Sequence, residues 1–169
     1  MIEVLKMAVY KPEIESASRS YIRAVQTARL IKMVENAYYN VPFYKNKLDE
    51  IGIKPEDIKS VDDITKLPFT VKTDLRDTYP FGLFAVPKDQ LLRIHASSGT
   101  TGKPTVVGYT ANDLKVWTEC VSRIACMGGA KPSDLAQICF GYGMFTGALG
   151  LHYGLENIGA TIIPSSTGN

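Results

Sequence analysis

A short glycine-rich loop near the middle of the chain carries the residues best suited to chemistry. It offers hydroxyl groups, glycines and a lysine at consecutive positions: Ser97, Ser98, Gly99, Thr100, Thr101, Gly102 and Lys103. Glycines let backbone amides approach a ligand closely, while hydroxyl and ammonium groups donate hydrogen bonds to anionic oxygens. Phosphate is therefore the ligand that this loop suits, although an ordinary surface loop contains the same residue types.

This loop differs from the Walker A loop of nucleotide-binding proteins. The Walker A motif places four residues between its glycines and a serine or threonine after its lysine. Here two residues separate Gly99 from Gly102, and Pro104 follows Lys103. Because Pro104 prevents a direct continuation into a helix, the sequence predicts a phosphate-binding loop of a different design.

A second glycine-rich segment, from Gly141 to Gly147, combines aromatic and small residues. Tyr142 and Phe145 are suited to pack against an aromatic ligand, and Gly143 and Gly147 leave room for one. The segment follows a predicted strand, which is where open α/β sheets bind ligands. The alternative is that both aromatic side chains simply fill the core above the sheet.

Two histidines lie near these segments. His95 stands at the end of a predicted strand beside the phosphate loop, where its ring is placed to donate to an oxygen. His152 falls in the middle of a predicted helix. For both residues, a buried histidine with satisfied hydrogen bonds is the favoured interpretation, and Lys72 and Arg76 are expected to have solvated or ion-pairing roles.

The elements that must position these residues fall into two parts. Residues 1–79 are predicted to form a mainly helical segment, and residues 80–169 to begin an α/β domain. Helical periodicity predicts one helix from Glu13 to Tyr39. Asn40 is then expected to cap a second, shorter helix that ends before Gly52.

The second part alternates short apolar runs with helical patterns. Strands are predicted over Leu91 to Ala96, Thr105 to Tyr109, Leu135 to Phe140 (as a buried strand) and Thr161 to Pro164. Helices are expected from Thr110, as the N-cap, to Met127 and from Ala148 to Ile158. The order strand, helix, strand predicts a right-handed parallel crossover and a mixed α/β fold class.

Composition is that of a globular chain, with 45% hydrophobic and 21% charged residues, which excludes disorder of the whole. The net charge of +2 gives no electrostatic argument for binding nucleic acid or a membrane surface. No apolar run approaches the ~20 residues of a spanning helix.

The cysteines, Cys120, Cys126 and Cys139, lack metal-site spacing and predict buried free thiols. Without a signal peptide, a cytoplasmic location is predicted.

The ordered string from Ser97 to Thr105 resembles the phosphate loop of the adenylate-forming superfamily, which includes acyl-coenzyme A synthetases. Neighbouring segments resemble the phenylacetate–coenzyme A ligase family. These segments are Leu67 to Asp77, Tyr79 to Gly82, Arg93 to Ala96, Val106 to Thr110, Gly141 to Gly147 and Leu149 to Gly154. The resemblance extends from about Ala17 to Asn169.

That resemblance implies a two-step, ATP-dependent ligase that serves phenylacetate catabolism. A carboxylate attacks the α-phosphorus of ATP, and the thiol of coenzyme A then displaces AMP from the acyl-adenylate. The loop from Ser97 to Lys103 would hold the β- and γ-phosphates with Mg²⁺ assisting, and Tyr142, Phe145 and Gly147 would border the acyl pocket. Phenylacetate is the leading acid, while indoleacetate, hydroxyphenylacetate and benzoate stay open.

The sequence departs from the family in its length. The family's adenine-binding motifs, its acidic magnesium ligand and the C-terminal domain with the catalytic lysine would all follow these 169 residues. The expectation is therefore an incomplete N-terminal fragment, inactive alone, without a catalytic or metal-binding residue of its own. An exposed cut face would favour self-association, as a homo-oligomer or otherwise. The alternative is a non-catalytic binding or interaction module that keeps the phosphate loop.

Overall fold

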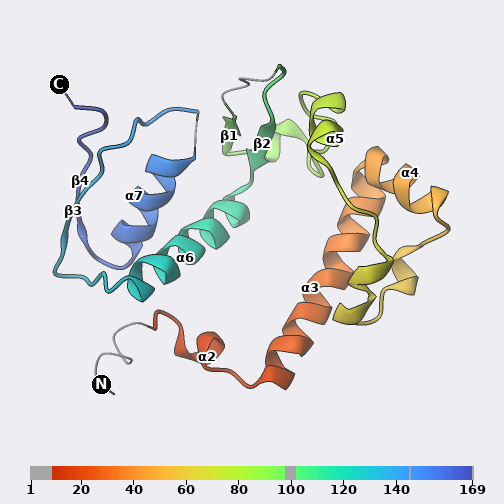
Figure 1. Cartoon of the computed structure of the whole chain (residues 1–169), viewed down its shortest axis with the longest axis horizontal. Helices are drawn as coiled ribbons and strands as arrows, with labels where there is room; N and C mark the ends of the chain where they lie inside the picture. The colour runs from red at the N-terminus through yellow and green to blue at the C-terminus, as the bar shows by residue number, and fades with distance from the viewer. Residues whose placement is uncertain (1–8, 98–101, 145, 169) are drawn as a thin grey trace. The chain divides into compact units, whose positions relative to one another are not determined.

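The structure, a computed structural model, describes residues 9–97, 102–144 and 146–168 (Figure 1). These residues cluster into two compact units. The helical unit takes its described residues from Ala17–Leu91 and Gly99–Val107, and the sheet unit from Met1–Ser16, Leu92–Ser98 and Gly108–Asn169. The division predicted at residues 79 and 80 stays a prediction.

The helical unit is built around one long helix. Its helices are α3 (Arg19–Asn40), α4 (Pro42–Glu50) and α5 (Lys72–Asp77), with the 3₁₀ turns η1 (Pro55–Asp57), η2 (Val61–Lys66) and η3 (Lys88–Gln90). Val34 and Tyr38, one helical turn apart on α3, are buried with Leu48 of α4 and with Ile58. This cluster joins the helices because positions i and i+4 share one face of a helix.

The boundaries of the first helices differ from the prediction. The expected helix from Glu13 to Tyr39 is broken into α2 (Pro12–Glu15), which belongs to the sheet unit, and α3. Ser18 adopts an extended backbone and its hydroxyl accepts a hydrogen bond from the Tyr21 amide at 3.2 Å, which starts α3. Serine competes for helix-terminal amides in this way, so it favours a cap over a helix interior.

The N-cap predicted for α4 was also wrong. Asn40 is the last residue of α3, and Val41 is the capping residue, with φ −123° and ψ 101°. The ring of Pro42 disfavours helical backbone at the residue before it, which explains why the break falls at Val41. Gly52 follows the end of α4 with φ +71°, and the predicted end of this helix is confirmed.

The sheet unit contains the predicted strand–helix–strand order. Besides α2, its elements are β1 (Arg93–Ala96), β2 (Val106–Tyr109, which crosses the unit boundary), α6 (Ala111–Met127), β3 (Leu135–Gln137), α7 (Gly147–Asn157) and β4 (Thr161–Ile163). Strands β1 and β2 form a two-stranded sheet, and β3 pairs in parallel with β4. Helix α7 connects β3 to β4, so the predicted parallel pairing and the α/β fold class are confirmed (Figure 1).

Helices α6 and α7 pack closely in this unit. Thr110 caps α6 as predicted, because its hydroxyl accepts from the Asp113 amide at 3.3 Å and its own amide donates to the Asp113 carboxylate at 2.8 Å. Gly150 and Gly154 of α7 lie against Trp117 and Val121 of α6. The absence of a Cβ atom at these glycines is what lets the two helices approach.

Two predictions of burial were wrong. Strand β3 is shorter than expected, and Leu135 is 66% exposed, because residues alternate between the two faces of a strand and only one face is covered here. Among the cysteines, Cys126 is buried, whereas Cys120 and Cys139 are exposed. All three are free thiols.

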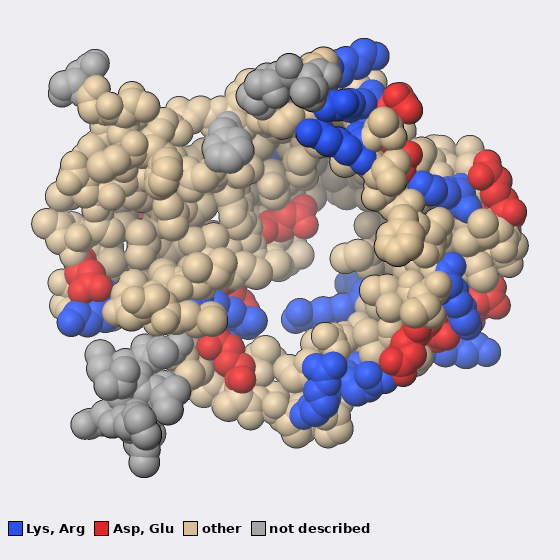
Figure 2. All heavy atoms as spheres, viewed as in Figure 1, with Lys and Arg blue, Asp and Glu red and all other residues tan. Residues whose placement is uncertain are grey.

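Charged side chains of both signs alternate over the surface of the helical unit (Figure 2). Several form ion pairs, such as Lys47 with Asp74 at 2.9 Å and Lys66 with Asp63 at 2.9 Å. In the described part of the chain, no helix has the length and apolar character needed to cross a membrane.

Candidate functional site

The end of β1 and the turn between β3 and α7 meet in the sheet unit. The Ala96 amide donates to the carbonyl oxygen of Met144 at 3.1 Å. The same oxygen lies 2.8 Å from Nδ1 of His95. Ala96 immediately precedes Ser97, the first residue of the predicted phosphate loop, and Met144 lies in the predicted acyl-pocket turn. The fold thus joins the beginning of one predicted site segment to the other.

Tyr142 contacts a side chain of α7. Its hydroxyl lies 3.1 Å from Nδ1 of His152, and the two rings meet edge to face with centroids 5.8 Å apart. Burial raises the pKa of the Tyr142 hydroxyl above its ordinary value. Nε2 of His152 is 4.0 Å from the Glu156 carboxylate. His152 therefore contacts Tyr142 through a polar group, but it is half-buried, where the sequence predicted a buried histidine.

Of the other residues predicted to border the acyl pocket, Gly147 is the first residue of α7. Phe145 lies outside the described residues, as do Ser98, Gly99, Thr100 and Thr101 of the phosphate loop. The loop residues that the structure describes are Ser97, Gly102 and Lys103. Gly102 has φ +121°, a backbone conformation that strains any residue with an L side chain. The glycine at this position is thus required by the backbone.

Lys103 lies over an aromatic ring. Its Nζ atom is 5.8 Å from the centroid of the Tyr79 ring, within the helical unit. A lysine ammonium is attracted to the electron-rich face of an aromatic ring, a contact of modest strength at an exposed position. Lys103 is exposed, so its charge is accessible to an anion.

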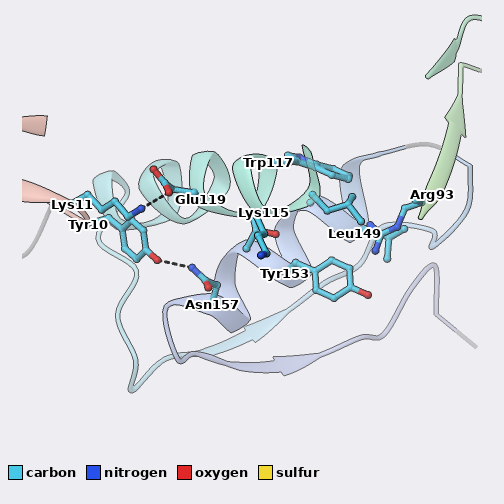
Figure 3. A pocket seen from close by; sticks show the side chains of 12 residues that line it. Tyr10, Lys11, Arg93, Lys115, Trp117, Glu119, Leu149, Tyr153 and Asn157 are labelled. Carbon is cyan, nitrogen blue, oxygen red and sulfur yellow. Dashed lines mark hydrogen bonds and ion pairs between the residues drawn. The ribbon is translucent and has the colours of Figure 1, made fainter. Parts of the chain in front are cut away.

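A pocket of about 450 Å³ opens between α6 and α7 (Figure 3). Its wall includes the ion pair of Lys11 with Glu119, and the guanidinium of Arg93, whose carbon lies 4.9 Å from the centroid of the Tyr153 ring. Trp117 and Leu149 contribute apolar surface. Sequence reasoning did not identify this pocket, because its residues come from four separate segments. Tyr142 and Gly147, the described residues of the predicted acyl pocket, do not line it.

The described residues do not gather a metal site. Within residues 9–97, 102–144 and 146–168, no three histidine, cysteine, aspartate or glutamate side chains lie close enough to hold one ion. Metal ions in proteins need several such ligands.

Comparison with curated proteins links nearly the whole chain to one enzyme. It is 53% identical over 160 residues to the phenylacetate–coenzyme A ligase of Thermus thermophilus, in a match that covers 95% of this chain and 36% of the ligase. It is also 53% identical over 155 residues to the phenylacetate–coenzyme A ligase of Escherichia coli (strain K12), covering 92% and 36% of the two chains. The chain therefore spans about one third of the length of these relatives.

Comparison with solved structures gives the same result for the fold. The thioesterification state of 2-hydroxyisobutyryl-CoA ligase, in complex with 2-HIB-AMP and CoA, matches with a TM-score of 0.87 and 29% identity, over 96% of this chain and 35% of the ligase. An open conformation of that ligase matches with a TM-score of 0.86. No protein-family model matches the chain. In sequence this chain resembles about one third of a phenylacetate–coenzyme A ligase, and in fold it resembles the corresponding share of an adenylate-forming CoA ligase.

Proposed function

We propose that this chain is part of an ATP-dependent aryl-acid–coenzyme A ligase, with phenylacetate as its leading acid. The observation that carries the proposal is the 53% identity to a phenylacetate–coenzyme A ligase over 95% of the chain. The solved ligase of the same fold is described in complex with an acyl-adenylate and coenzyme A, which supports the adenylate-forming class. A cytoplasmic location and any self-association stay predictions.

In this proposal the loop from Ser97 to Lys103 binds the β- and γ-phosphates of ATP. The backbone of Gly102, with φ +121°, supports this role, because a glycine without a Cβ atom lets the chain approach a ligand closely. Lys103 supplies a compact, exposed positive charge. The loop then stabilises the negative charge of the pyrophosphate leaving group.

The turn that contains Tyr142, Phe145 and Gly147 borders the acyl group in this proposal. The contact with His152 supports the role of Tyr142, because a ring fixed by a polar contact presents a defined apolar face. An aromatic ring of the substrate packs against that face, while small residues leave space for it.

The reaction consists of two displacements. The substrate carboxylate attacks the α-phosphorus of ATP, which releases pyrophosphate and forms the acyl-adenylate. The coenzyme A thiol, as it loses its proton, then attacks the acyl carbon and releases AMP. This chain contributes positioning and charge stabilisation, the main requirements of such chemistry. The described residues do not fit a metal site of their own, so no step is assigned to a magnesium ion held by this chain.

A substrate-dependent pyrophosphate exchange assay on the full-length protein tests the proposal. Phenylacetate is expected to support exchange of labelled pyrophosphate into ATP, with indoleacetate, hydroxyphenylacetate and benzoate compared at equal concentration. Formation of phenylacetyl-coenzyme A in a second assay completes the reaction. ATP binding without exchange on any of these acids would instead support the non-catalytic module and overturn the proposed ligase.

A further inference from the structure

The pocket between α6 and α7 lies wholly within the sheet unit, and no step of the proposed reaction uses it. The two helices form its walls, with Arg93 of β1 at one end and Tyr10, just before α2, at the other (Figure 3). At the Tyr10 end, the tyrosine hydroxyl accepts a hydrogen bond from the side-chain amide of Asn157 at 2.6 Å. A volume of about 450 Å³ is sufficient for a small-molecule ligand.

The charged side chains that line this pocket leave an excess of positive charge. The basic ones are Lys11, Arg93 and Lys115, and the acidic one is Glu119. The Glu119 carboxylate is already paired with Lys11 and, at 2.6 Å, with Arg123. In the described part of the chain, neither Arg93 nor Lys115 forms an ion pair. The lining therefore favours a ligand that carries negative charge.

Arg93 is the residue best suited to bind such a ligand. Its guanidinium lies over the Tyr153 ring, and its buried Nη1 atom has no hydrogen-bond partner among the described residues. These surroundings hold the half-buried guanidinium in place, and its donors on Nε and Nη2 stay available to a ligand. A partly desolvated charge without a partner is unfavourable. Because the planar guanidinium can donate two parallel hydrogen bonds, a carboxylate is the anion that it suits.

Aromatic and apolar side chains form the surface toward the Arg93 end of the pocket (Figure 3). Trp117 stacks on Tyr109 with ring centroids 5.3 Å apart, and it meets the buried His95 ring edge to face at 5.7 Å. These neighbours fix the Trp117 ring, while Tyr153 and Leu149 add further apolar surface. Fixed aromatic rings beside a cation suit a flat aromatic ligand that carries an anionic group.

We propose that this pocket is a binding site for an aromatic carboxylate. Arg93 binds the carboxylate, Trp117 and Tyr153 contact the aromatic ring, and Lys115 adds a second positive charge. The site is separate from the turn that is proposed to border the acyl group, because the described residues of that turn do not line the pocket. The proposal therefore stands independently of the ligase function.

The test measures binding of 1-naphthoate to the full-length protein by calorimetry. Saturating phenylacetyl-sulfamoyl-adenosine, a stable analogue of the acyl-adenylate, is present to occupy the proposed catalytic site. Under these conditions 1-naphthoate is expected to bind with a Kd below about 1 mM, in line with the usual affinity per atom of a small ligand. Failure of the analogue itself to bind would count against the ligase function and not against this site.

Two further probes separate the charge from the aromatic ring. The neutral 1-naphthamide has nearly the same shape as 1-naphthoate and is expected to bind about tenfold more weakly, because it offers no charge to Arg93. Inorganic phosphate offers charge without a ring, so an equal concentration of it is expected to leave the Kd of 1-naphthoate within about twofold. Equal binding of the amide, or displacement by phosphate, would overturn the assignment of an aromatic carboxylate.

Variants then locate the binding in this pocket. Arg93→Gln is expected to raise the Kd of 1-naphthoate by about tenfold, as for a lost charge-assisted hydrogen bond. Lys115→Gln, at an exposed position, is expected to raise it about threefold and carries the test should Arg93→Gln fail to fold. Arg29→Gln, an exposed arginine on α3 of the helical unit, is the matched control and should keep the native Kd. The proposal is overturned if the native protein does not bind 1-naphthoate, or if the pocket variants bind it as Arg29→Gln does.

Discussion

At the scale of single residues, Asp49 is a carboxylate of the helical unit that several donors surround. Its oxygens receive hydrogen bonds from the ammonium groups of Lys45 and Lys54 and from the hydroxyl of Tyr38 at 2.7 Å. Both lysines also lie 5.3 Å from the centroid of the Tyr38 ring. The contacts with Lys45, Lys54 and Tyr38 hold the pKa of the Asp49 carboxyl well below its ordinary value.

This environment predicts a pH-dependent effect of Asp49→Asn. Because the carboxyl pKa is lower in the folded chain than in the unfolded one, its stabilisation is present above pH ~4 and is lost as pH falls below that value. Asp49→Asn should therefore lower the Tm at pH 7, and the difference should shrink toward pH ~2. Asp62→Asn, whose partner is the exposed Arg23, is the control and should have the smaller effect. A difference independent of pH would contradict the charge-based explanation.

Lys103 gives a second prediction at this scale. Lys103→Ala in the full-length protein should raise the KM for ATP by about tenfold, as expected for a lost charge-assisted hydrogen bond, with little change in the KM for the acid. Lys88→Ala is a matched control, because Lys88 lies over the Phe81 ring at 4.1 Å and is outside the predicted loop. Steady-state kinetics of pyrophosphate exchange provide the measurement. An unchanged KM for ATP would remove Lys103 from the phosphate-binding role.

At the scale of elements, the contact between α6 and α7 organises the sheet unit. Gly150 and Gly154 face α6, and Ser122 bridges the helices through its contact with the Gly154 carbonyl oxygen. A Cβ atom at Gly150 would lie 2.8 Å from Cζ2 of Trp117, the residue whose ring also contacts His95. The distance between α6 and α7 therefore determines where the Trp117 ring lies against His95, near the end of β1.

Gly154→Ala should destabilise the protein through this contact. The new Cβ atom would lie 2.6 Å from Cβ of Val121, so the helices must separate. Overpacking costs about 1–3 kcal/mol, against a gain of about 1 kcal/mol from the helix propensity of alanine. A net loss of about 1 kcal/mol, corresponding to about 2–4 °C in Tm, should appear in thermal unfolding. Glu156→Ala, on an exposed position of α7, is the control; a stabilised Gly154→Ala would refute the close contact.

At the scale of the whole molecule, the chain consists of a helical unit and a sheet unit, and it spans about one third of its curated relatives. In the proposed ligase, this chain contributes the loop that binds ATP and the turn that borders the acid, while its match covers 36% of the Thermus thermophilus ligase. We therefore expect the proposed activity to require a polypeptide of the relatives' full length.

The prediction at this scale compares the 169-residue chain with a full-length ligase. Residues 1–169 expressed alone should catalyse phenylacetate-dependent pyrophosphate exchange more than about a hundredfold more slowly than a full-length ligase. Even small misplacements of reacting groups reduce reaction rates by about that factor. The Thermus thermophilus ligase, which is 53% identical to this chain, is the positive control in the same assay. Carboxylate-dependent exchange by the 169-residue chain at a comparable rate would contradict the prediction.

Local sequence signals were sufficient for most of the fold. Thr110 and Asp113 predicted the start of α6, Gly52 predicted the end of α4, and the strand–helix–strand order predicted the parallel pairing of β3 with β4. These features depend on nearest neighbours along the chain, where capping and backbone preference operate. The break between α3 and α4 was predicted one residue too early, at Asn40 instead of Val41, although the signal, Pro42, was present.

The candidate site also has one part that the sequence predicts and another that depends on tertiary packing. The loop from Ser97 to Lys103 and its resemblance to adenylate-forming enzymes were identified from sequence alone, because a phosphate-binding loop is a contiguous string of residues. The contacts of Tyr142 with His152, and of His95 with Met144 and Trp117, were decided only by the tertiary structure. His95 and Met144 are separated by 49 positions, and a hydrogen bond over that separation depends on how the strands and helices pack together. The sequence alone thus predicted which residues are suited to bind phosphate. The packing of the elements decided which distant residues contact the end of β1 and the turn after β3, because those contacts join segments far apart in the chain.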